Sequence, residues 1–150
     1  MKTYRTTLAA SLAASLAFAA TAMAASAPPT EASRLSSEYA EWAGGHSNAE
    51  SLVAGLRNGA PVTIVTNGRD RSVSIAGFTP ASAMSYGGVS SALSGAQHSL
   101  SRLGITKPNA EQIQAALIGG EIRTASGATT VMKGSVVARG NTPNRVASSR

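Results

Sequence analysis

Few side chains in this sequence could carry acid–base or metal chemistry. The chain holds two histidines, His46 and His98, one aspartate and six glutamates, and it has no cysteine. His46 and His98 with one carboxylate would form a metal site or the centre of a small hydrolase. Neither histidine has a second histidine at the close spacing of zinc motifs. A metal-binding or hydrolytic function is therefore the alternative hypothesis and not the first.

Nucleophilic catalysis has even less support. A Ser–His–Asp triad would need Asp70, which stands between Arg69 and Arg71 beside a predicted turn, where it neutralises local charge. No serine occupies a Gly-x-Ser-x-Gly elbow. The lack of cysteine excludes thiol nucleophiles, thiolate zinc sites and disulfides. We expect no catalytic residue, no metal ligand and no cofactor.

Recognition of another molecule is the more natural use of the remaining polar residues. Arg69, Asp70 and Arg71 form a charged segment at the predicted end of a hairpin, and we assign them as the candidate binding residues. The alternative for these three is a solvated turn. The basic residues are dispersed and aromatic residues make up 4% of the chain, which argues against a nucleic-acid surface.

The first 24 residues have the pattern of a secretory signal peptide. Lys2 and Arg5 precede an apolar run over 8–20, and Ala22-Met23-Ala24 is the small-x-small pattern that a signal peptidase cleaves. The run is too short for a membrane anchor. We therefore predict a periplasmic or secreted protein of residues 25–150, with no transmembrane anchor. Loss of Lys2 and Arg5 leaves 11 basic residues against 7 acidic ones, a net charge of +4.

The first half of the mature chain predicts two helices and a hairpin. In the N-terminal segment 25–46, Thr30 caps a helix whose apolar stripe is Leu35, Tyr39 and Trp42. Ser47 and Glu50 match a capping box that begins the next helix, which leaves His46 exposed before it. Segments 62–65 and 72–75 are expected strands, joined at the turn pair Asn67-Gly68.

The second half predicts two more helices and two extended segments. Apolar residues recur along a helix at spacings of four and three, at Val89, Leu93, Ala96, Leu100 and Leu103. Its other side carries small residues, which would permit close approach of a second helix in a dimer or face water. Another helix begins at Pro108-Asn109 and ends at Gly119-Gly120. Segments 122–124 and 129–138 are extended, and 139–150 is a polar tail that we expect to be disordered.

Two stretches of the chain are alike at a constant offset of 61 residues. Asn48-Ala49-Glu50 through Gly59 and Asn109-Ala110-Glu111 through Gly120 share their Asn-Ala-Glu start, an internal Ala and Leu, and a terminal Gly. Helix caps alone explain the ends, but they do not explain the internal matches. We therefore predict a helix–strand–strand duplication, with units starting at 47 and 108.

These elements predict a small single α+β domain over 47–138. About four helices would pack on a small antiparallel sheet built from the four extended segments. The Asn-Ala-Glu helices that end in glycine resemble those of a family of uncharacterised exported proteobacterial proteins. That resemblance implies the compartment and the architecture, and it implies no activity and no site residue.

The function predicted from the sequence is that of a non-enzymatic interaction or accessory module with a protein partner in the cell envelope. A small-ligand carrier with a pocket between sheet and helices is a further alternative. The scarcity of aromatic residues and the abundance of alanine favour a tight core over a roomy one.

Overall fold

The computed structural model describes residues 30–68, 72–124 and 126–140. The predicted signal peptide 1–24, the candidate residues Arg69 to Arg71 and most of the predicted tail lie outside these ranges. The described elements, in chain order, are α1 (Glu31–Tyr39), α2 (His46–Asn58), β1 (Val62–Asn67), β2 (Val73–Phe78), α3 (Tyr86–Arg102), α4 (Ala110–Ile118), β3 (Gly120–Arg123) and β4 (Thr129–Met132). The predicted α+β class is confirmed.

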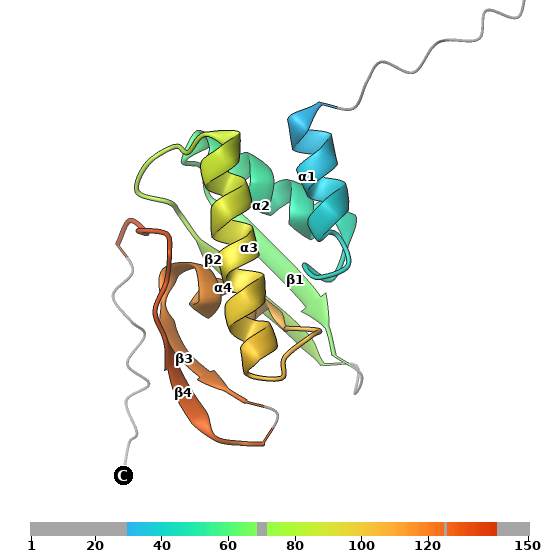
Figure 1. The fold of residues 1–150 in the computed structure, drawn as a ribbon, viewed down its shortest axis with the longest axis vertical. Coiled ribbons are helices and arrows are strands. Elements are labelled where there is room, and N and C mark those ends of the chain that lie inside the picture. The colour runs from blue at the N-terminus through green and yellow to red at the C-terminus, as the bar shows by residue number, and fades with distance from the viewer. Residues whose placement is uncertain (1–29, 69–71, 125, 141–150) are drawn as a thin grey trace, which may run out of the picture.

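The strands form two separate antiparallel hairpins (Figure 1). β1 pairs with β2 from Val62↔Phe78 to Asn67↔Val73, and β3 pairs with β4. The expectation of one sheet containing all four extended segments is therefore wrong. Helix α4 packs against both β2 and β3, and its glutamine side chains bind main-chain carbonyls of Gly77 in β2 and Arg123 in β3. Side chains of a helix thus take the edge positions that a neighbouring strand would need.

Helix ends were predicted well where the cap is local. Thr30 Oγ1 accepts from Ser33 N at 3.3 Å, and Asn109 forms a capping box with Gln112, with distances of 2.9 and 3.0 Å. The capping box predicted for α2 is wrong. That helix begins at His46, with Gly45 at the N-cap and no capping side chain.

His46 therefore lies inside α2, and its Nε2 pairs with Oε1 of Glu50 at 3.3 Å on the exposed side of the helix. The physical reason is the third residue of the helix, Asn48. Its buried side chain binds the backbone of the preceding loop and of β1, which determines where the first turn starts.

Aliphatic residues from all four helices and from both hairpins make one continuous core. In Figure 1, α3 runs along the molecule in front of the β1–β2 hairpin, with α1 and α2 toward one end and the β3–β4 hairpin toward the other. Its predicted apolar stripe is confirmed for Val89, Leu93, Ala96 and Leu100, which are buried, whereas Leu103 is half-buried. Within the described ranges, no helix has the length and apolar character needed to cross a bilayer.

Gly95 on the exposed side of α3 provides a simple stability prediction. A Cβ at this position would have no heavy atom within 4 Å, and glycine is a poor helix former because its unfolded backbone is so free. Gly95→Ala should therefore raise the free energy of unfolding by about 1 kcal/mol. Urea denaturation followed by circular dichroism measures the change, and an unchanged or lower midpoint would contradict it.

The order of elements repeats, because α2 and α4 are each followed directly by an antiparallel hairpin. The two units differ in detail. α2 has no side-chain cap whereas α4 has a complete capping box, and three residues separate α2 from β1 where Gly119 alone separates α4 from β3. The duplication itself stays a prediction.

Candidate functional site

The candidate binding residues Arg69, Asp70 and Arg71 lie outside the described residues, but both of their neighbours are described. Gly68 N donates to Ser72 O at 2.7 Å, and Asn67 pairs with Val73 across the hairpin. β1 thus extends through Asn67, and the predicted two-residue turn at Asn67-Gly68 is wrong. The strand is prolonged because Thr66 has a tertiary contact of its own.

Three segments that are distant in sequence meet at this end of β1 and enclose a surface groove of about 860 Å³. They are the loop after α1, the end of β1 and the loop before α4. We call this hollow the β1-end groove. Its lining residues are Ala40, Glu41, Trp42, Gly44, Gly45, Thr66, Asn67, Gly68, Lys107, Pro108 and Asn109.

Two buried polar side chains hold the three segments together. Asn48 Nδ2 donates to Ala43 O and to Val65 O, both at 2.8 Å, and its Oδ1 accepts from Val65 N at 3.0 Å. This ties the loop after α1 to β1. Thr66 Oγ1 accepts from Ala110 N at 2.9 Å, which ties the start of α4 to the same strand. A first-turn N–H of α4, which has no partner in its own helix, is thereby satisfied.

The loop after α1 reaches the groove through a close glycine contact. Gly44 has a φ of +79°, and a Cβ there would lie 3.0 Å from Cγ2 of Thr66. Trp42, from the same loop, is buried at 5% exposure and packs edge-on to Tyr39 with 6.2 Å between the ring centroids. Its Nε1 has no hydrogen-bond partner among the described residues. The groove therefore has a wall made of closely packed loop and strand.

A second and smaller groove of about 430 Å³ lies between α1, α2 and the start of α3. Arg57 and Tyr86 line it, and the guanidinium carbon of Arg57 is 5.1 Å from the centre of the Tyr86 ring. Arg57 Nη1 also donates to Met84 O at 3.2 Å. Arg57 is thus already bonded to the loop before α3 and packed on Tyr86. Because its guanidinium is occupied by these contacts, this groove is the weaker candidate for binding.

The two histidines do not come together with a third ligand in the structure. His46 is exposed on α2 and paired with Glu50, and His98 is exposed on α3. Among the described residues, no three His, Cys, Asp or Glu side chains lie close enough to share a metal ion. The metal and hydrolase hypothesis thus gains no geometric support from this part of the chain.

Comparison with known proteins supports no family assignment. No family model, no curated protein and no solved structure matches the chain. The resemblance to exported proteobacterial proteins therefore stays a prediction.

The contacts of Thr66 and Asn48 that hold this groove together were not predicted from the sequence. Thr66 had a detectable signal, because it follows Val62 and Ile64 at the strand period of two and is a polar residue on the buried side. Asn48 was noticed only as part of a helix-start motif. Its long-range pairing with β1 has no local signal, since it depends on how α2 lies along the strand.

Proposed function

We propose that this is an exported, non-enzymatic interaction module that binds an extended segment of a cell-envelope protein in the β1-end groove. The signal-peptide pattern of residues 1–24 supports export to the periplasm or beyond. The groove supports binding, because loop and strand backbone from three segments line it and it carries the charged residues Glu41 and Lys107.

One observation carries the proposal. Gly68 lines the groove and is followed directly in the chain by Arg69, Asp70 and Arg71. Arg69 and Arg71 thus follow a groove residue within three positions of the chain, and Lys107 lines the groove itself. These three cations outnumber Glu41 and Asp70, so the expected partner segment is acidic. Charges at the rim of an interface steer association and select partners of opposite sign.

The test is affinity capture with the tagged mature chain, residues 25–150, from a periplasmic extract, with bound proteins identified by mass spectrometry. We expect one partner near stoichiometry that is absent from an unrelated exported control protein. Arg69→Ala with Arg71→Ala should weaken binding of the purified partner about tenfold or more, and Lys107→Ala should weaken it further.

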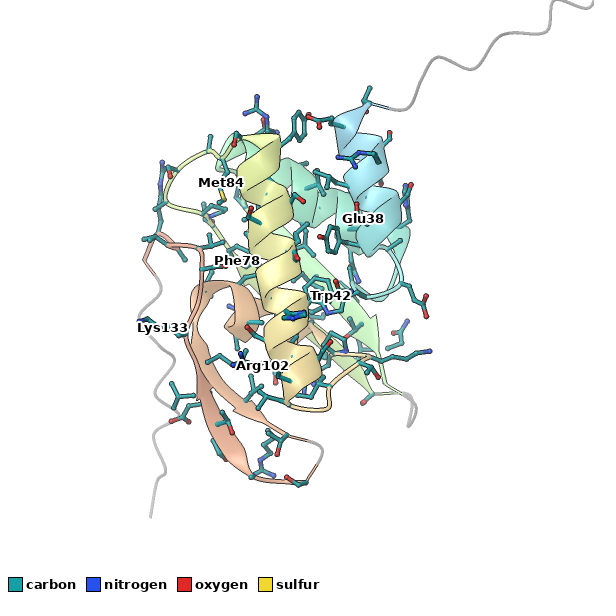
Figure 2. The ribbon with its side chains drawn as sticks, viewed as in Figure 1. Glu38, Trp42, Phe78, Met84, Arg102 and Lys133 are labelled. Atoms are coloured by element: carbon teal, nitrogen blue, oxygen red, sulfur yellow. The ribbon has the colours of Figure 1, made fainter. Side chains whose placement is uncertain are left out.

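The matched control is Arg34→Ala with Lys133→Ala. It removes the same charge from two exposed residues that do not line the groove, and Figure 2 shows Lys133 at the margin of the molecule away from Trp42. This control should bind like the wild type. Equal loss of binding in both double variants would show that the effect comes from net charge alone. Unchanged binding of the variant with Arg69→Ala and Arg71→Ala would show that these arginines are not part of the binding site.

A further inference from the structure

The β1-end groove is lined by two charged residues of opposite sign. Glu41 comes from the loop after α1 and Lys107 from the loop before α4. The other described residues that line the groove are uncharged. Both Glu41 and Lys107 are exposed, so a ligand in the groove would meet one carboxylate and one ammonium group.

The described part of the protein neutralises neither of these charges. Its ion pairs join Glu31 to Arg34 and His46 to Glu50. Glu41 and Lys107 thus line one groove without pairing with each other or with another described residue. A ligand that covers either group must supply a counter-charge, because a charge that loses its water without gaining a partner is costly.

The backbone that carries the two side chains is held in place on both sides of the groove. In the loop after α1, a bond from Gly45 N to Ala40 O at 2.8 Å spans Glu41. Lys107 precedes Pro108, which is buried and whose ring restricts φ. The points at which the two charges enter the groove are therefore set before a partner binds, which lowers the ordering cost of binding.

We infer that the acidic partner segment proposed above also carries one basic side chain, which pairs with Glu41 while an acidic side chain pairs with Lys107. This inference rests on the proposed function, because it concerns the same groove. The two charges belong to different segments of the groove wall, so an acid and a base in a given order fit in one direction only. The reverse direction would bring acid to Glu41 and base to Lys107, and such like-charge contacts select against it.

Glu41→Ala separates this inference from binding of a purely acidic segment. Glu41 would repel a segment that has acids alone, so removal of its carboxylate would tighten binding of that segment. A segment whose base pairs with Glu41 would instead bind the variant about fivefold more weakly. Lys107→Ala should weaken binding in both cases, and it therefore reports whether the segment occupies the groove.

The probe is a random library of displayed peptides, selected on the immobilised mature chain, residues 25–150. Peptides whose affinity falls with Lys107→Ala are synthesised, and isothermal titration calorimetry measures their dissociation constants. We expect them to share one order of acid and base and to bind Glu41→Ala more weakly. Peptides that have acids alone, or that bind Glu41→Ala more tightly, would overturn the inference and leave the groove as a binding site. Selection of no peptide that responds to Lys107→Ala would overturn the proposed function and this inference together.

Exchange of the two charges tests the direction of binding. Glu41→Lys with Lys107→Glu keeps the net charge and should weaken a selected peptide about twentyfold or more. The same peptide with its own acid and base exchanged should regain binding to this variant. Equal binding of the two peptides would contradict a fixed direction.

Glu38→Lys with Lys133→Glu is the matched control for the exchange. It makes the same two changes at exposed residues that do not line the groove, and Figure 2 shows Glu38 on α1 and Lys133 at the opposite margin of the molecule. This control should bind the selected peptide like the wild type. A loss equal to that of the Glu41 and Lys107 exchange would overturn the assignment of the two charges to the site.

Discussion

Asn48→Ala is expected to lower the free energy of unfolding by about 3 kcal/mol, because it leaves buried main-chain groups without partners. The Asn48 side chain makes three hydrogen bonds, to Ala43 O and to both main-chain groups of Val65, and the residue is 8% exposed. Removal of one partner from buried polar groups costs their desolvation. Urea denaturation measures the loss, and a shift below about 1 kcal/mol would show that water replaces the amide.

Asn48→Asp removes the hydrogen-bond donor of this side chain and keeps an acceptor. The carboxylate can still accept from Val65 N, but its second oxygen would face Ala43 O and Val65 O, which are both acceptors. We therefore expect Asn48→Asp to destabilise at least as much as Asn48→Ala. Asn58→Ala is the matched control, because Asn58 is exposed in the last turn of the same helix. It should change the free energy of unfolding by less than about 0.5 kcal/mol.

Gly134→Ala is expected to destabilise the protein by about 3 kcal/mol or more, through direct overlap with backbone. A Cβ on Gly134 would overlap the carbonyl carbon of Ile118 and the nitrogen of Gly119, and would lie 2.6 Å from Cα of Ile118. Gly134 has no positive φ, so the effect comes from space alone. Backbone at the end of α4 cannot move aside without loss of the bond from Val136 N to Leu117 O at 2.8 Å.

Thermal unfolding of the Gly134→Ala and Gly95→Ala variants compares the effects of the same substitution at two sites of this protein. Both variants add the same methyl group to a glycine, one where backbone fills the space and one where no atom lies within 4 Å. We expect a melting temperature lower by about 10 °C or more for Gly134→Ala and higher by a few degrees for Gly95→Ala. Similar melting temperatures for the two variants would mean that the segment after β4 can move away from α4.

The sequence was sufficient wherever a structure depends on neighbouring residues. Thr30 was recognised as a helix cap, and Pro108-Asn109 as a helix start, because a side chain three residues from its target is a local feature. The apolar stripe of α3 followed from its spacing, and the extended run over 62–65 predicted the strand that the structure contains. The α+β class followed from the order of these segments.

Tertiary contacts decided the places where prediction failed. Ser47 and Glu50 match a capping box, yet α2 begins two residues earlier, with Gly45 in place of Ser47 at the N-cap, because Asn48 binds a strand 17 residues further along the chain. Asn67-Gly68 matches a tight turn, but the bond of Thr66 to the start of α4 keeps β1 extended beyond it. In both cases a buried long-range hydrogen bond outweighs a local preference, since an unmade buried bond costs more than a lost cap or turn.

By itself, the sequence determined the helices and strands, the α+β class and the small number of groups able to do chemistry. Only the tertiary structure decided that the strands form two hairpins and that two loops and the end of β1 meet at the β1-end groove. The reason is physical. Periodicity and caps are properties of neighbouring residues, whereas a groove depends on which distant segments pack side by side.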